Sequence, residues 1–168
     1  FFLLSKDPSG WQALGLGQSS DAHHISSPDP SGRGALASMK MALNDGNLGP
    51  LDIDYINLHG TGTIKNDEME ASAVFEIFQD KTYVSSTKPM IGHTLGAAGA
   101  LETAFCALCL SSFNTGRNLP RHFFDGEYDT ELPKLLLVRG ETGFIPKVCM
   151  SNSYAFGGNN ASIILGRI

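Results

Sequence analysis

The sequence predicts an α/β layered domain, and three observations support this fold class. Short apolar runs of strand length alternate with stretches of helical periodicity. Loops rich in glycine and polar residues follow three of the predicted strands, at 57–63, 86–100 and 151–160. The 168 residues are 42% hydrophobic and 17% charged, which suits one compact domain, 1–168, with a sizeable core.

Six segments have the length and composition of strands. In chain order they are 11–17, 53–58, 82–86, 135–138, 147–152 and 161–165. The run at 53–58 is largely apolar, as in strands that are buried within a layered sheet. The last two runs flank a Gly-rich turn and are expected to form a hairpin. We therefore expect a mixed sheet with helices packed on it.

Three segments have helical periodicity: 33–43, 66–78 and 93–110. The first stops at Asn44-Asp45-Gly46, a typical helix end. Asn66 is a suitable N-cap for the second, and the acidic residues after it suit the positive end of a helix. The polar segments 21–34 and 114–133 are predicted to be irregular connections.

Charge and hydropathy exclude several classes of function. The formal net charge of −5, without any run of Lys or Arg, argues against nucleic-acid binding. No apolar run approaches the roughly 20 residues of a membrane-spanning helix, so we expect a soluble protein with no membrane partner. The chain begins at Phe1 rather than Met, and we interpret 1–10 as the remnant of a junction with a preceding part of a longer protein.

The three cysteines are an odd number without the spacing of an extracellular disulfide framework, which indicates a reducing cytoplasm. Cys106 and Cys109 form a C-x-x-C pair, which can be a redox or metal motif. Both lie in the apolar segment 101–110, with no further Cys or His at ligand spacing. Core packing is therefore the favoured interpretation, and no metal site is expected.

Two histidines and a lysine stand in the loops that follow predicted strands. His59 lies in the first of these loops, and Lys88 and His93 lie in the second. Ligand sites of α/β sheets lie beyond the carboxyl ends of the strands. We therefore expect His59, Lys88, His93 and the turn Phe156-Gly157-Gly158 to converge in one cleft.

The chemistry of these groups points to a carbonyl substrate. Two neutral imidazoles can each donate one N–H to an enolate or a tetrahedral oxyanion, and Lys88 adds a fixed positive charge. Backbone amides at 156–158 could donate to a second oxyanion, since glycine allows close approach to a ligand. Thr61 and Thr63 are hydroxyl donors suited to an amide-bearing arm. The set predicts acyl or enolate chemistry.

Three motifs together resemble the β-ketoacyl-acyl-carrier-protein synthases. They are H-G-T-G-T at 59–63, S-T-K-P-M-I-G-H-T-L-G-A-A-G-A at 86–100 and N-S-Y-A-F-G-G-N-N at 152–160. The resemblance covers about residues 11 to 168 and implies the carboxyl-terminal half of a thiolase-like fold, without the amino-terminal half. Enzymes of this family condense a cysteine-bound acyl group with malonyl carrier protein, releasing carbon dioxide and lengthening the chain by two carbons.

The resemblance also implies roles for individual residues. His59 and His93 would donate to the malonyl thioester oxygen, Lys88 would be the site lysine, and Phe156 would gate the nucleophile, with its backbone N–H in the oxyanion hole. Asp67 and Glu70 would be acidic residues near Lys88, orienting it or holding a cation. The residues expected to bind substrate or its phosphopantetheine arm are Ser26, Thr61, Thr63 and Gly157. No resident cofactor is expected, because the carrier protein brings this arm.

Structural interpretations of these residues remain open. Asp67 and Glu70 share one helical face near its start, where stabilisation of the helix dipole alone could explain them. Thr61 and Thr63 could be ordinary turn residues, and an isolated histidine often caps a helix or satisfies a loop carbonyl. Structural or solvated roles are favoured for the remaining histidines, His23, His24 and His122.

The chain departs from the family pattern in ways that bear on function. None of its cysteines occupies the strand-to-helix turn that carries the family's nucleophile, so this chain alone is expected to be inactive. Lys65 and Asn159 replace residues common in relatives, which leaves acyl-chain preference open.

Two functions are therefore considered. The first is the carboxyl-terminal half of an elongating synthase in fatty-acid or polyketide-type synthesis, working with an upstream half and acyl carrier protein as a homodimer or heterodimer. The second is a non-catalytic partner subunit of the chain-length-factor type. Candidate basic residues for docking an acidic carrier protein are Lys65, Arg117 and Arg121.

Overall fold

The fold is built on one mixed sheet. The computed structural model describes residues 4–6 and 10–167, so most of the expected junction segment, 1–10, lies outside the described residues. The sheet has six strands in the order β1-β6-β5-β2-β3-β4. The strand bounds are β1 (Trp11–Ser20), β2 (Tyr55–Asn57), β3 (Tyr83–Ser85), β4 (Leu136–Leu137), β5 (Val148–Ala155) and β6 (Asn159–Arg167). The pairs among β5, β2, β3 and β4 are parallel, whereas β1-β6 and β6-β5 are antiparallel.

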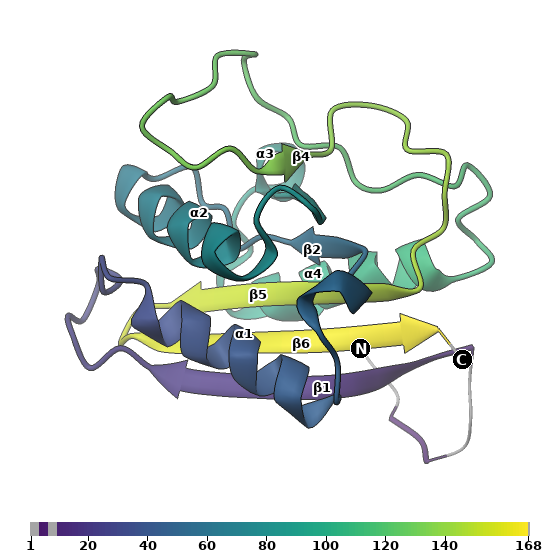
Figure 1. Cartoon of the computed structure of the whole chain (residues 1–168), viewed down its shortest axis with the longest axis horizontal. Coiled ribbons are helices and arrows are strands. Elements are labelled where there is room, and N and C mark those ends of the chain that lie inside the picture. The colour runs from purple at the N-terminus through teal and green to yellow at the C-terminus, as the bar shows by residue number, and fades with distance from the viewer. Residues whose placement is uncertain (1–3, 7–9, 168) are drawn as a thin grey trace.

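Helices cover both faces of the sheet (Figure 1). α1 (Arg33–Asp45) and α2 (Ile64–Phe78) lie on one face, and α4 (Ala98–Leu110) lies on the other. The short elements are η1 (Pro50–Asp52), α3 (Lys88–Ile91) and η2 (Leu95–Ala97). Each face has its own buried cluster, because Met39 and Val74 pack on one side of the strands and Cys106 and Leu110 on the other. The predicted α/β layered fold is confirmed.

Strand β5 is buried on both faces, which explains its mixture of apolar and small polar residues. Met150 belongs to the cluster under α1 and α2, whereas Cys149 belongs to the cluster under α4. Further along, Asn152 reaches the Met39 sulfur at 3.4 Å on the first side. The side chains of successive residues therefore point to opposite layers, as the pleat of a strand requires.

Two sequence-based boundaries are wrong. The second helix begins at Ile64 with Thr63 as its N-cap, so Asn66 lies inside the first turn and its amide donates to Asp67 and Glu70. The predicted helix 93–110 begins only at Ala98. It cannot begin earlier because Gly92 and Leu95 have positive φ angles of 74° and 51°, which an α-helix does not accommodate.

The hairpin of the last two strands and the packing role of the cysteines are confirmed. β5 and β6 pair in register from Val148–Gly166 to Ala155–Asn159. Cys106, Cys109 and Cys149 are all free and buried, and burial raises the pKa of Cys109 to about 12. In the described part of the chain, no helix combines the length and the apolar character needed to cross a bilayer.

Candidate active site

His59 lies just beyond the carboxyl end of β2, in a loop that Glu70 of α2 holds in place. The Glu70 carboxylate accepts the His59 N–H at 2.8 Å and the Gly60 N–H at 2.7 Å, one on each oxygen. Gly60 has φ 42°, and a Cβ there would lie 2.5 Å from the Ser86 Cβ, so only glycine fits. The loop is therefore fixed by a buried carboxylate and by close packing against the residue that follows β3.

Lys88 is buried between this loop and α4. Its ammonium donates to Glu102 Oε1 and to the His59 carbonyl, and it lies 3.4 Å from His59 Nδ1. Residue exposure is only 6% for Lys88 and 1% for Glu102, so water does not screen this ion pair. The acidic partner of Lys88 is thus Glu102, rather than Asp67 or Glu70 as expected.

Glu102 is a site residue that the sequence interpretation missed. It is the single charged residue of α4, whose other members are apolar or small. A lone carboxylate in an apolar helix rarely stays buried without a cationic partner. That pattern, together with Lys88 in the preceding loop, was the available signal.

His93 follows α3 and faces His59. The two ring centroids lie 5.5 Å apart with an interplanar angle of 83°. The Leu95 N–H donates to His93 Nδ1 at 3.2 Å, so a neutral His93 carries its proton on Nε2. The Lys88 ammonium faces Nδ1 of His59 in the same way. Each imidazole therefore carries its proton on Nε2, which makes no hydrogen bond within 4–6 and 10–167.

The electrostatic surroundings keep both rings neutral. Burial, the Lys88 charge and the proximity of His93 lower the pKa of His59 to about 3. Burial and Lys88 also lower the pKa of His93. Burial raises the pKa of Glu102, while the hydrogen bond and charge of Lys88 oppose that shift. At neutral pH the site thus offers two uncharged N–H donors beside one buried cation, the arrangement that stabilises a developing oxyanion.

The residues expected to bind substrate lie on linked loops. The Gly157 N–H donates to the Ile25 carbonyl at 2.7 Å, which joins the loop carrying Ser26 to the turn that presents Phe156. Lys65 Nζ donates to Ser27 Oγ at 3.3 Å and joins the same loop to the start of α2. There the Thr61 and Thr63 hydroxyls bond each other at 2.9 Å. Phe156 is 79% exposed at the tip of its turn.

His122 and His24 make local hydrogen bonds. His122 Nδ1 accepts the Ser86 N–H at 3.0 Å, and His24 Nδ1 accepts the Ser26 N–H at 3.1 Å. These contacts fit the structural interpretation of both residues. Across 4–6 and 10–167, no group of three or more His, Cys, Asp or Glu side chains is arranged to hold a metal ion.

Glu70 leads to a prediction about pH and stability. Burial raises its pKa from 4.5 to about 7, against the opposing effect of the Gly60 and His59 N–H groups. The folded state therefore binds this proton more tightly than the unfolded state. The Glu70 contribution to the free energy of unfolding is present below pH 4.5 and is lost as pH rises through 7, by about 3 kcal/mol.

Glu70→Gln should remove this part of the pH dependence, because the amide does not titrate. Urea denaturation of both proteins between pH 4.5 and 7.5 measures the difference between their slopes. Glu68→Gln, on the exposed side of the same helix, is the matched control and should keep the wild-type slope. Parallel slopes for wild type and Glu70→Gln would contradict the prediction.

The fold and the site define an α/β domain that places two neutral imidazoles and a buried lysine beyond the carboxyl ends of its parallel strands. The chain matches the family model of the beta-ketoacyl synthase C-terminal domain over residues 12–117. It therefore belongs to the beta-ketoacyl synthase family and forms the C-terminal domain, one half of the thiolase-like fold.

Relatives and solved structures match nearly the whole chain. It is 37% identical to 3-oxoacyl-[acyl-carrier-protein] synthase 2 of Coxiella burnetii and 40% identical to that of Rhizobium meliloti, covering 94% and 93% of this chain. A ketosynthase in complex with its chain length factor from Xenorhabdus doucetiae matches at 45% identity and TM-score 0.91, over 98% of this chain and 41% of that one. A beta-ketoacyl synthase from Burkholderia phymatum matches at 34% identity and TM-score 0.82, over 95% and 38%. The chain spans only 38% and 37% of the two curated relatives.

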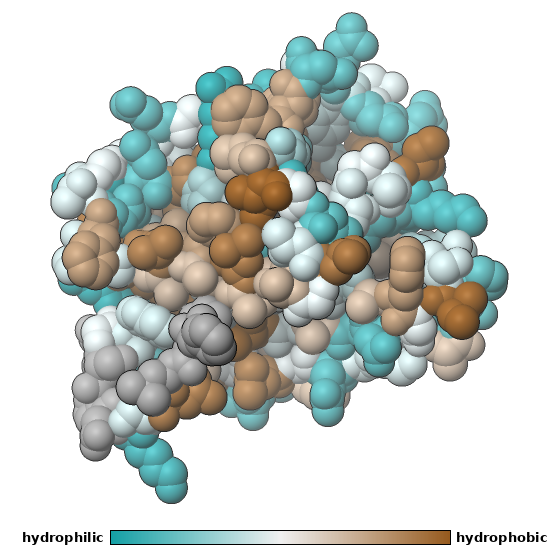
Figure 2. Space-filling model, turned by 180° about the vertical axis from the view of Figure 1, so that it is seen from behind, coloured by the Kyte–Doolittle hydropathy of each residue, from teal (hydrophilic) through white to brown (hydrophobic). Residues whose placement is uncertain are grey.

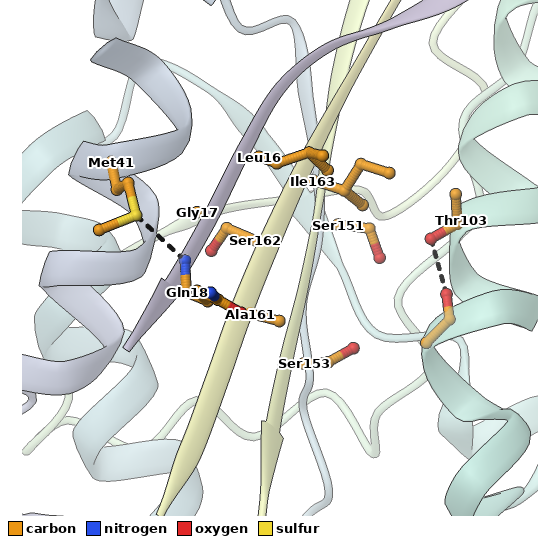
Figure 3. Close-up of a pocket in the computed structure, with 11 residues that line it drawn as sticks. Leu16, Gly17, Gln18, Met41, Thr103, Ser151, Ser153, Ala161, Ser162 and Ile163 are labelled. Carbon is orange, nitrogen blue, oxygen red and sulfur yellow. Dashed lines mark hydrogen bonds between the residues drawn. The ribbon is translucent and has the colours of Figure 1, made fainter. Parts of the chain in front are cut away.

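One face of the sheet is left partly uncovered beside α4. A cavity of about 550 Å³ lies there along β1, β6 and β5 (Figure 3). Its lining is mostly small, and Ser151 Oγ, although buried, has no hydrogen-bond partner among the described residues. Figure 2 shows hydrophobic residues gathered on this side of the molecule. An exposed apolar patch of this kind is typical of an interaction surface.

Proposed function

We propose that the protein containing this chain is a 3-oxoacyl-[acyl-carrier-protein] synthase, and that this chain supplies its decarboxylation machinery. One observation carries the proposal: His59 and His93 meet at 5.5 Å as neutral rings, each with Nε2–H free. A malonyl thioester oxygen that accepts both N–H groups would be stabilised as it becomes an enolate oxygen.

The condensation then follows in two steps. The bond between the malonyl carboxylate and C2 breaks and carbon dioxide leaves. The electron pair of the broken bond stays on C2 and forms the enolate that His59 and His93 would hold. C2 next attacks the carbonyl of an acyl thioester, and the enzyme thiolate leaves as the new carbon–carbon bond forms. Lys88, held by Glu102, would face Nδ1 of His59 and add positive potential.

The thiolate comes from outside this chain in this proposal. Cys106, Cys109 and Cys149 are buried, and burial raises the pKa of Cys109 and Cys149, which disfavours the reactive thiolate. The curated relatives are more than twice as long as the matched region. The additional half would supply the nucleophile and cover the face beside α4.

The remaining partners belong to the same proposal. An acyl carrier protein would bring the phosphopantetheine arm, and Ser26, Thr61, Thr63 and Gly157 would line its path, with no resident cofactor required. Two similar solved structures are described as ketosynthases with chain length factors, which supports a dimer, whether homodimeric or heterodimeric. A purely non-catalytic subunit is less well supported, since it would have no use for two oriented imidazoles.

Intact mass spectrometry of the complete gene product tests the proposal. After incubation with an acyl carrier protein thioester, we expect the addition of one acyl group, and after addition of malonyl carrier protein we expect release of carbon dioxide and a product longer by two carbons. A protein that binds carrier protein but neither becomes acylated nor releases carbon dioxide would support the non-catalytic partner instead.

A further inference from the structure

We propose that Tyr154 is a positioning residue that holds the imidazole of His59 in its donating orientation. The Tyr154 and His59 ring centroids lie 5.7 Å apart at an interplanar angle of 64°. His93 contacts His59 in a second edge-on arrangement, at 5.5 Å and 83°. His59 is therefore flanked by two inclined rings, and such contacts favour one orientation of the ring over its rotations. The inference rests on the proposed function for its catalytic meaning.

Tyr154 is well suited to be the fixed side of this arrangement. It lies in β5, where it pairs with Asn160 of β6, and only 6% of its surface is exposed. Its ring belongs to the buried cluster beneath α1 and α2. His93, in contrast, is exposed and stands in a loop. A rigid strand thus supports one side of His59, while the other side can open toward substrate.

The remaining neighbours of His59 act on other parts of the residue. Lys88 of α3 faces Nδ1 and the carbonyl, and Glu102 of α4 neutralises Lys88. Glu70 of α2 binds the backbone N–H. Lys88 constrains the imidazole at the single atom Nδ1, whereas Tyr154 and His93 pack their rings against the imidazole ring itself.

The hydroxyl of Tyr154 contributes nothing visible to this role. Its Oη is buried and has no hydrogen-bond partner among the residues that the structure describes. The other deeply buried tyrosine, Tyr55, differs because its Oη contacts Ser85 Oγ at 2.8 Å and accepts from the Asn57 amide at 3.2 Å. An unpaired buried hydroxyl destabilises a protein. We therefore infer that the ring of Tyr154, rather than its hydroxyl, serves the site.

Two substitutions in the complete protein separate ring from hydroxyl. Tyr154→Phe should keep the kcat of malonyl carrier protein decarboxylation and raise the midpoint of thermal unfolding. Tyr154→Leu should lower kcat by roughly tenfold with little change in KM, because a loosely held donor weakens the transition state more than binding. Tyr55→Phe removes a paired hydroxyl and should lower the midpoint of thermal unfolding. It is therefore a control whose shift is opposite in sign to that of Tyr154→Phe.

A titration of His59 distinguishes positioning from general loss of packing. In Tyr154→Leu, water reaches the imidazole, so its ring ¹³C resonance should titrate at a higher pH than in wild type or Tyr154→Phe. Phe78→Leu, at the far end of α2 in the same buried cluster, should lose stability but leave both this titration and kcat unchanged. Unchanged kcat and titration in folded Tyr154→Leu would overturn the inference. A wild-type protein that releases no carbon dioxide would instead refute the proposed function. In that case the titration of His59 in Tyr154→Leu would still test whether Tyr154 holds the His59 ring.

Discussion

Replacement of His93 by alanine in the complete protein should lower the rate of malonyl decarboxylation by about 10²- to 10³-fold, the usual cost of losing one oxyanion donor. The Nε2–H of His93 is free because Nδ1 already accepts the Leu95 N–H. Acylation of the enzyme by an acyl carrier protein thioester should stay largely intact, since the family resemblance assigns the oxyanion of that step to the backbone N–H of Phe156 rather than to His93. The expected result is an acyl-enzyme that accumulates without elongation.

Parallel assays identify the cause of the loss. Intact mass spectrometry measures acylation, and release of labelled carbon dioxide measures decarboxylation. His93→Gln, which keeps an N–H donor, should recover part of the rate. His23→Ala, an exposed histidine with no predicted role, should behave like wild type. Loss of acylation with normal decarboxylation in His93→Ala would contradict the assigned role.

The positions of His59 and Lys88 could be predicted because strand ends are visible in the sequence. The strands predicted at 53–58 and 82–86 end within one residue of the ends of β2 and β3, and parallel neighbours in a sheet bring such ends together. The layered fold followed from the same alternation. Sequence periodicity predicts each strand and helix separately. The order of the parallel strands in the sheet then brings the loops at their ends together in one site.

The residues that support the site were less predictable because their partners are distant in sequence. Glu70 lies on the expected helix but binds the backbone of His59 rather than Lys88. Helical spacing shows which residues share a face, but it does not show what that face contacts. Likewise, small residues after His93 have helical propensity, yet the positive φ of Leu95 places His93 in a loop and supplies the N–H that fixes its tautomer.

The largest effect on stability is expected for the buried pair of Lys88 and Glu102. Lys88→Met leaves an uncompensated carboxylate in the interior, which should cost about 3 to 5 kcal/mol of the free energy of unfolding. Glu102 Oε2 has no partner in the described residues even in wild type, so the loss of Lys88 removes the only ionic partner of this carboxylate there. Lys40→Met, which breaks the exposed pair with Glu76, should have a far smaller effect.

Two further observations separate a buried charge from lost packing in Lys88→Met. Without its cationic partner, Glu102 should have a pKa raised further above its ordinary value, so the variant should be most stable in acid and lose stability as pH rises through that pKa. The double variant Lys88→Met, Glu102→Leu contains no buried charge and should regain most of the lost stability. It should nevertheless remain slow in decarboxylation, because Nδ1 of His59 no longer faces a donor. If urea denaturation instead gives additive losses for the two substitutions, the pair is not coupled and Lys88 acts through packing alone.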